Sequence, residues 1–465
     1  MSQKNETTVL VLALLITLGV VGGGLWLFKD NIISQNQPNP NSQSNNNQES
    51  IKDRISFGEK TLITGEIAPP KKEGVEAIAA GNNEKAIAPL TAALKLKPND
   101  PEALIFLNNA RIGTAKSYTI VTSLPIGNDP NASLEILRGI AQAQNEINAS
   151  GGIKGVLLKV AIANDDDNPE ISKQIATTLV KNPEVLGVIG PNTSDATLAA
   201  GTVYTSGKLV AISPTSTSVK ISNFSRYVFR TVPSDFIAAR SLANYMVKKL
   251  QKKNAAVFFN SQSNYSQSLK SEFVSSVSLE GGQVSNEFDL SQANFSAARS
   301  VEQAIKQGAE VLMLASNNDT LDKALQVVQV NDKRLPLLGG DDVYMLKTLE
   351  VGREKAVGMV VAVPWHIDGN ISSDFPQKSR QLWGADVNWR TALAYDATQA
   401  FIAALELNPS REGVQLALTS SNFSATGASG AIRFLGSGDR NAPVQLVKIA
   451  PGTRSRTGYD FVPLP

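Results

Sequence analysis

The chain has 465 residues, with 44 basic and 42 acidic side chains and a formal net charge of +2. A charge this close to neutral does not favour nucleic-acid binding. Because the sequence has no cysteine and one histidine, it excludes disulfides, thiolate sites and histidine-rich metal sites, and it disfavours hydrolytic or redox catalysis.

The N-terminal residues 1–28 are predicted to form a membrane anchor. Residues 9–28 carry no charge, and a helix of that length spans about 30 Å, the hydrocarbon thickness of a bilayer. A cleaved signal peptide is the alternative, but its apolar region is shorter, roughly 7–15 residues, and no clean A-x-A site follows here. Residues 29–70 begin with a tract rich in Asn, Gln, Ser and Pro and are predicted to be a disordered tether.

Residues 71–112 are predicted to form a short helical hairpin. Apolar residues recur at helical spacing in two segments, which prolines at 98 and 101 separate. The segment resembles one tetratricopeptide repeat at Gly81, Ala86, Leu90, Ala93 and Pro98. One copy cannot bury its own apolar face, so two alternatives remain: a helical spacer packed on the next domain, or a docking site for a partner.

Residues 117–465 predict an α/β domain. Strands at 118–126, 156–163 and 185–190 alternate with helices at 134–148 and 169–181, and the series restarts after an interruption at 229–235. Such a series favours parallel sheets with helices on both faces. It predicts a first lobe of about 117–233 and 366–430 and a second lobe of about 236–362 and 432–465, joined by several crossings around a cleft. The strands near 432–435 and 445–450 are assigned to the second lobe.

Two loops of small hydroxyl residues follow neighbouring strands of the first lobe. Thr193 and Ser194 follow the strand at 185–190, and residues 215–218 follow the strand at 208–212. The carboxyl ends of parallel strands share one edge of a sheet, where open α/β sheets bind ligands. The N-terminus of the intervening helix lies beside these hydroxyls and suits a small anion such as a carboxylate.

A set of segments in order through this domain carries a family resemblance. They are ILRGIAQAQNEINASGGIKG at 136–155, NDDDNPE at 164–170, IGPNTSDATLAA, AISPTSTS, FRTVPSD, NYSQSLKSEF at 264–273, LAYDATQAF at 393–401 and GASGAIRF at 427–434. The chain resembles the type I periplasmic solute-binding proteins of branched-chain amino acid ABC transporters, the leucine/isoleucine/valine-binding group. The resemblance implies two Rossmann-like lobes, three hinge crossings, closure around an amino acid, and delivery to ABC permease subunits from the periplasmic side of the inner membrane.

The resemblance also implies five ligand-binding residues and no cofactor. Ser194 would bind the ligand carboxylate, and Thr215 and Thr217 would contact carboxylate and ammonium. Tyr265 would cover the ligand from the second lobe, and Asp341 would pair with the α-ammonium. The chain departs from the family at three positions. The loop at 127–133 lacks the family's frequent aromatic residue, the acid at 341 is aspartate where the family often has glutamate, and the family's second aromatic of the second lobe falls near an asparagine at 317. These departures favour a more polar amino acid, or a related small carboxylate or amide.

Each candidate residue has a structural alternative. Ser194 could be a helix N-cap, Tyr265 could cap a helix, and Asp341 could lie in a solvated turn. The aspartates at 165–167 resemble a metal cluster but lack the spacing of a calcium loop, which favours a turn or cap. His366 is predicted to be structural. For the whole chain, a membrane-tethered solute-binding protein is the leading hypothesis, a ligand-sensing receptor ectodomain is the alternative, and an enzyme is disfavoured by the missing catalytic pairs and cofactor motifs.

Overall fold

The computed structural model describes residues 51–369 and 373–464, and the chain divides into two compact units, residues 1–53 and 54–465. All the elements named below belong to the second unit. The predicted membrane helix at 9–28 lies outside the described residues. Among the helices that are described, none has the length and apolar character needed to cross a membrane.

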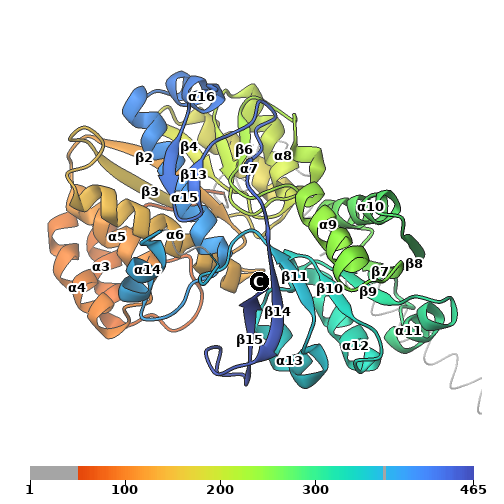
Figure 1. Cartoon of the computed structure of the whole chain (residues 1–465). Coiled ribbons are helices and arrows are strands. Elements are labelled where there is room, and N and C mark those ends of the chain that lie inside the picture. Colours follow the sequence, from red (N-terminus) through yellow and green to blue (C-terminus); the bar gives the residue numbers. More distant parts are fainter. Residues whose placement is uncertain (1–50, 370–372, 465) are drawn as a thin grey trace, which may run out of the picture. The chain divides into compact units, whose positions relative to one another are not determined.

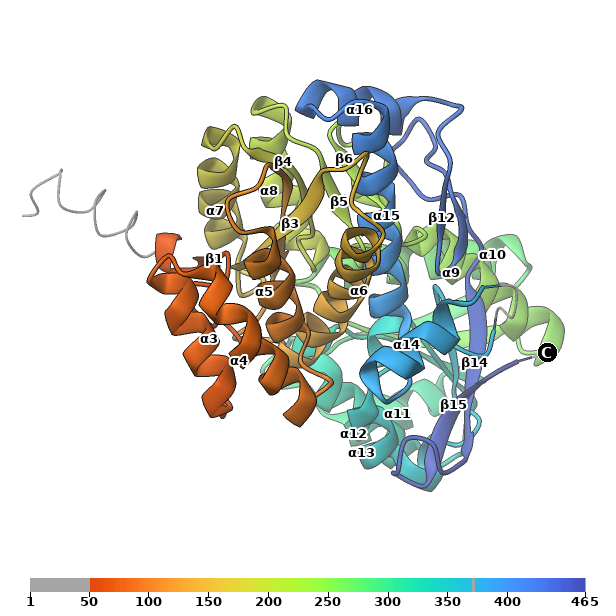
Figure 2. The same ribbon diagram turned by 90° about the vertical axis from the view of Figure 1, so that its left-hand side faces the viewer.

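The first lobe is built on a six-stranded sheet in the order β1-β3-β2-β4-β5-β6. All neighbours are parallel except β1, which is antiparallel to β3. Figures 1 and 2 show α5 (Pro101–Ile112), α6, α15 and α16 on one side of this sheet and α7 and α8 on the other. The strands are β1 (Ile55–Ser56), β2 (Ser117–Leu124), β3 (Leu157–Asn164), β4 (Val185–Ile189), β5 (Ala211–Ser213) and β6 (Val228–Arg230), and the helices are α6 (Pro130–Ala149), α7 (Pro169–Lys181), α8 (Ser194–Ser206), α14 (Phe375–Trp383), α15 (Trp389–Leu407) and α16 (Arg411–Thr419).

The second lobe is built on a seven-stranded sheet in the order β15-β14-β11-β10-β9-β7-β8. Strands β7 to β11 are parallel, and the C-terminal strands β14 and β15 add an antiparallel edge. Figure 1 shows this lobe in green to blue, below and to the right of the first. Its strands are β7 (Asn254–Phe259), β8 (Gln283–Asp289), β9 (Val311–Ala315), β10 (Leu337–Gly339), β11 (Val360–Val363), β14 (Gln445–Pro451) and β15 (Tyr459–Pro463), and its helices are α9 (Asp235–Asn244), α10 (Asn264–Leu279), α11 (Ala297–Lys306), α12 (Leu321–Asn331) and α13 (Leu346–Ala356).

Three crossings join the lobes, between β6 and α9, between β11 and α14, and before β14. The third crossing lies later than the sequence predicts. Strand β13 (Gly430–Ile432) pairs with β12 (Ala425–Gly427), and Arg440 forms a buried ion pair of 3.1 Å with Asp396 of α15. The assignment of residues 432–435 to the second lobe is therefore wrong, because a hairpin and a buried ion pair hold this segment on the first lobe.

The segment before β2 folds as three helices rather than the predicted two, α3 (Pro69–Ala79), α4 (Asn83–Leu96) and α5 (Pro101–Ile112). Gly81 lies between α3 and α4 and has a φ of 74°, a conformation that glycine adopts easily. The Asn82 side chain caps α4 by accepting from Lys85 N at 3.2 Å. Helix α5 packs on the first lobe, where Asn109 donates to Val160 O at 2.7 Å. This packing matches the spacer alternative, and a docking role for the segment stays a prediction.

The chain is held against the first lobe earlier than the predicted tether allows. Ile55 and Ser56 pair with β3, and the buried Glu102 carboxylate accepts from the backbone N–H groups of Leu62 and Ile63 at 2.7 and 3.1 Å. The prediction of a disordered tether is therefore wrong for residues 54–63. Pairing with β3 and the Glu102 carboxylate satisfy backbone groups of residues 54–63, which form no helix of their own.

Candidate functional site

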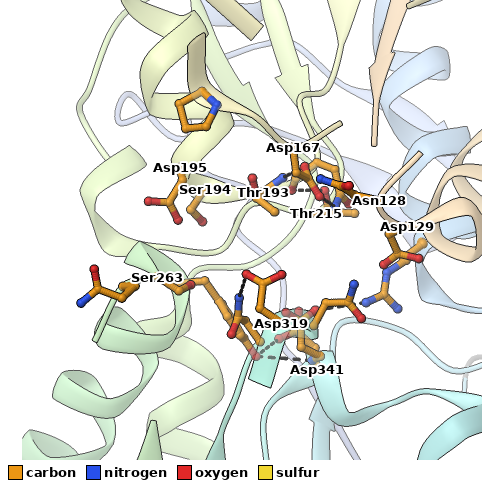
Figure 3. A pocket seen from close by; sticks show the side chains of 18 of the residues that line it. Asn128, Asp129, Asp167, Thr193, Ser194, Asp195, Thr215, Ser263, Asp319 and Asp341 are labelled. Atoms are coloured by element: carbon orange, nitrogen blue, oxygen red, sulfur yellow. Dashed lines mark hydrogen bonds and ion pairs between the residues drawn. The ribbon is translucent and has the colours of Figure 1, made fainter. Parts of the chain in front are cut away.

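A cavity of about 310 Å³ lies between the two lobes. Figure 3 shows its side chains converging from the first lobe above and the second lobe below. Most of the lining residues follow the carboxyl end of a parallel strand: those at 128–129 follow β2, 167 follows β3, 192–195 follow β4, 262–265 follow β7, 317–319 follow β9, and 341–342 follow β10. The edges that bind ligands in open α/β sheets thus face each other across this cavity.

The first-lobe wall is a loop network around the N-terminus of α8. Thr193 is the N-cap, and its hydroxyl accepts from Ala196 N at 3.3 Å. Ser194 is therefore not the cap. It is the first residue of the helix, lines the cavity and accepts from Ser218 N at 3.2 Å. Thr215 also lines the cavity and donates to Asn192 O at 2.6 Å, which leaves its oxygen lone pairs able to accept.

Thr217 is buried and is absent from the residues that line the cavity. It lies at the first crossing, where its carbonyl accepts from Asp235 N at 2.9 Å. The structure therefore does not bring Thr217 together with Ser194 and Thr215 at the cavity wall. The sequence pattern of alternating hydroxyls could not show this, because the loop turns toward the second lobe between 215 and 217.

The aspartates at 165–167 hold the first-lobe loops together. Asp165 accepts from Ser123 Oγ at 2.6 Å, and Asp166 pairs with Arg54 at 2.8 Å. Asp167 lines the cavity and accepts from Thr193 N at 3.1 Å and from Asn192 Nδ2 at 3.0 Å. None of the three caps a helix, since Asn168 caps α7 and Thr193 caps α8; instead they join the loops that follow β2, β3 and β4.

In the second lobe, Tyr265 and Asp341 form a buried pair. The Tyr265 hydroxyl donates to Asp341 Oδ1 at 2.7 Å and accepts from Asp342 N at 3.4 Å. A Cβ on Gly340 would lie 2.4 Å from the tyrosine oxygen, so glycine is required there for the hydroxyl to reach the carboxylate. Ser263, not Tyr265, caps α10, and Asp341 is 7% exposed rather than in a solvated turn.

The carboxylates of the second-lobe wall have less positive charge nearby than negative charge, with Arg390 forming one ion pair, to Asp342. Burial, together with the charge of Asp235, raises the pKa of Asp341 to about 6. Burial likewise raises the pKa of Asp342 to about 7, with a contribution from Asp341, although Arg390 opposes the shift. Burial and both aspartates also raise the pKa of Tyr265, which stays a neutral donor. Raised carboxyl pKa values in a cleft are typical of functional sites.

The lobes contact each other on both sides of the cavity. On one side, Asp195 of α8 accepts from Asn264 N at 3.0 Å and from its side chain at 2.5 Å. On the other, Arg390 at the start of α15 pairs with Asp342 at 3.1 Å. These contacts enclose the cavity in the present arrangement, and breaking them would open it.

Four further residues line the cavity that were not predicted from the sequence: Asp129, Asp319, Trp389 and Arg390. Asp129 and Asp319 could have been found, since each lies shortly after a predicted strand of the parallel series. Trp389 and Arg390 carry no such signal, because they reach the cavity through the N-terminus of a helix. His366, near the second crossing, is buried and lies 3.1 Å from Phe461 O through Nε2, as a structural residue would.

A model of the periplasmic binding protein family matches residues 127–454, which is most of the chain and all of the cavity. The chain belongs to the periplasmic binding protein family. Relatives of this periplasmic binding protein include an amino acid binding protein of Pseudomonas aeruginosa, 32% identical over 28% of this chain and 35% of that protein. The Leu/Ile/Val-binding protein of Escherichia coli is 22% identical over 56% of this chain and 72% of its own length.

Solved structures confirm the two-lobed fold. A substrate-binding protein from Desulfitobacterium hafniense in complex with Leu superposes with a TM-score of 0.64, at 22% identity, over 75% of this chain and all of that one. A leucine binding protein from Thermotoga maritima gives a TM-score of 0.65 at 21% identity, covering 74% and 97%. A solute binding protein from Rhodopseudomonas palustris in complex with 3,4-dihydroxybenzoic acid gives 0.64 at 16%, covering 75% and 96%. These TM-scores establish the fold of this periplasmic binding protein.

Proposed function

We propose that this chain is an extracytoplasmic solute-binding protein that captures an amino acid or a related small carboxylate or amide by lobe closure. The observation that carries the proposal is the enclosed cavity between the carboxyl edges of both sheets, with hydroxyls and a helix N-terminus on one wall and buried carboxylates on the other. Membership of the periplasmic binding protein family supports binding rather than catalysis.

The two walls suit the two ends of an amino acid. Ser194 and Thr215, beside the N-terminus of α8, would receive the carboxylate, because backbone N–H groups and the helix dipole favour an anion there. Asp341 would pair with the α-ammonium, since a buried charge is costly unless it is paired. The Tyr265 ring would cover the ligand, and its hydroxyl would hold Asp341 in place.

Delivery to an ABC permease belongs to the same proposal, supported by relatives described as amino acid and Leu/Ile/Val-binding proteins. The uncharged stretch at residues 9–28 supports a membrane anchor, with the bulk of the chain in the periplasmic or extracytoplasmic space. Protease digestion of intact spheroplasts tests this location: cleavage from outside supports it, and protection until lysis would contradict it.

A thermal-shift screen of the twenty amino acids with small carboxylates and amides tests ligand binding. We expect at least one to raise the melting temperature, because a ligand that binds only the folded state stabilises it. Ser194→Ala should remove this shift, while Ser206→Ala, an exposed serine at the other end of α8, should keep it. The absence of any stabilising compound, or an unchanged shift in Ser194→Ala, would contradict the proposal.

A further inference from the structure

The cavity is strongly acidic. Six aspartates and one arginine are the charged residues among those that line it: Asp129, Asp167, Asp195, Asp319, Asp341, Asp342 and Arg390. Figure 3 shows Asp129, Asp167 and Asp195 on the first-lobe side of the cavity, with Asp319 and Asp341 opposite them on the second. Carboxylates of like charge on facing walls repel each other, so they oppose closure of the lobes on a neutral or anionic ligand.

Four of the lining aspartates form what we call the acidic cluster: Asp342 and the three whose charges act on it, Asp129, Asp319 and Asp341. After burial, the influences that raise the pKa of Asp342 are the charges of Asp341, Asp129 and Asp319. Arg390 forms one ion pair, with Asp342. In the described part of the chain no basic side chain pairs with the other three members, so the cluster has an excess of negative charge.

The same end of the cavity holds unsatisfied donors. Trp389 Nε1 and Arg390 Nη1 have no hydrogen-bond partner, although the two residues are only 1% and 4% exposed. Both residues line the cavity. Buried N–H groups without a partner destabilise the protein, and a ligand with acceptor oxygens would satisfy them. A simple polyamine also lacks the carboxylate expected at Ser194 and Thr215, so a ligand with positive groups and a carboxylate fits this cavity better.

The lining offers little to an aliphatic side chain. Its apolar surface comes from Pro169, Tyr265 and Trp389, and no Leu, Ile, Val, Met or Ala lines the cavity. Binding sites for apolar ligands are normally lined mainly by hydrophobic side chains. The side chain of the ligand must therefore be polar, and the surrounding charge decides its sign.

We propose that the ligand is a cationic amino acid, with its α-ammonium on Asp341 and a second positive group among Asp129, Asp319 and Asp342. The inference rests on the proposed function and deepens it. The cation would lie between carboxylates of both lobes, so it would turn the repulsion between the walls into an attraction that favours the closed arrangement.

Titration calorimetry at pH 8 with lysine and norleucine tests the charge. The two ligands share the α-amino and carboxylate groups and the carbon chain, and differ by the terminal ammonium. We expect lysine to bind at least about tenfold more tightly, because close charge pairs in enclosed sites contribute more than about 1.4 kcal/mol. Putrescine, which lacks the carboxylate, should bind more weakly than lysine.

Asp319→Asn and Asp129→Asn test the cluster. Asparagine at 129 can still cap α6, as Asp129 does by accepting from Ala132 N at 2.9 Å, so that variant removes charge and keeps the cap. Each variant should lower the lysine-to-norleucine affinity ratio about threefold or more, because a cation loses one of its carboxylates. Asp322→Asn is the matched control: it lies near Asp319, pairs with Lys347 and is 69% exposed, and it should leave the ratio unchanged.

The outcomes separate the two proposals. Tighter binding of norleucine, leucine or glutamate than of lysine would overturn the cationic ligand and leave the solute-binding function standing. Putrescine binding as tightly as lysine would overturn the amino acid assignment. A lysine preference unchanged in both cluster variants would overturn the role of the cluster. If no amino acid or related compound bound, the proposed function itself would fail.

Discussion

The two walls of the cavity hold their carboxylates in different ways. In the first lobe, backbone N–H groups satisfy them: Asp167 accepts from Thr193 N, Asp129 from Ala132 N, and Asp195 from Asn264 N across the cavity. In the second lobe, side chains do so: Asp341 accepts from the Tyr265 hydroxyl, and Asp342 pairs with Arg390.

This difference indicates that the two sets of carboxylates have different roles, one in stabilising the fold and the other in binding ligand. A carboxylate that satisfies backbone N–H groups is part of the loop structure, so its loss leaves buried donors unpaired. A carboxylate that is held by one side chain contributes little to the stability of the fold. Because burial and like charges raise its pKa, its charged form is strongly stabilised when a positive ligand binds. We therefore expect loss of the Asp167 acceptor in the first wall to act mainly on stability, and loss of the Asp341 charge in the second wall to act mainly on affinity.

The largest effect is expected for Asp341→Asn. The amide keeps an oxygen for the Tyr265 hydroxyl but removes the charge that pairs with the ligand ammonium. Affinity should fall by about 2–5 kcal/mol, the usual cost of removing one partner of an enclosed charge pair. The melting temperature without ligand should stay the same or rise. Calorimetry and thermal unfolding measure both; unchanged affinity, or a clear loss of stability, would contradict the division between the walls.

A smaller effect, on stability rather than on affinity, is expected for Asp167→Ala. Thr193 N and Asn192 Nδ2 would lose their acceptor at the start of α8, at a cost of about 1–3 kcal/mol in stability. Glu170→Ala is the control, because this carboxylate lies nearby at the start of α7 with its side chain 73% exposed. Denaturant unfolding measures the difference, and an Asp167→Ala protein as stable as the control would show that the first wall is not structural.

A third prediction concerns pH. Burial raises the pKa of Asp235 and of Asp342 to about 7, whereas an unfolded aspartate has a pKa of about 3.9. Between these values the folded state binds more protons, so the stability of the ligand-free protein should fall as pH rises from about 4 to 7. His366, whose pKa burial lowers, opposes this trend with a single group.

Thermal unfolding without ligand should therefore give a higher melting temperature at pH 5.5 than at pH 7.5. Asp342→Asn should reduce that difference, because asparagine does not titrate. A melting temperature that rises over this range would contradict the raised carboxyl pKa values on which the second wall depends.

The order of strands and helices could be predicted because parallel βαβ units impose their own periodicity. That order also placed Ser194 and Thr215 at a sheet edge, the family resemblance added Tyr265 and Asp341, and all four line the cavity. Thr217 could not be placed, because the direction of a side chain in an irregular loop depends on contacts with the other lobe. The hairpin before β14 was missed for a related reason: the Arg440–Asp396 ion pair that holds it joins distant parts of the chain.

The acidic character of the cavity was equally invisible in the sequence, where 42 acidic residues are spread along a nearly neutral chain. Only the meeting of segments that follow five different strands brings six aspartates together. The departures at 127–133 and 317 indicated a polar ligand, but its charge required the three-dimensional arrangement.

Ligand-driven closure of the two lobes is the central claim, and a distance between them tests it most directly. The chain has no cysteine, so Thr177→Cys on α7 and Gln303→Cys on α11, both exposed, can carry a unique pair of spin labels. Saturating lysine should shift the label-to-label distance distribution to a new, narrower population, and leucine at the same concentration should shift it less. A distribution that no amino acid changes would contradict the account.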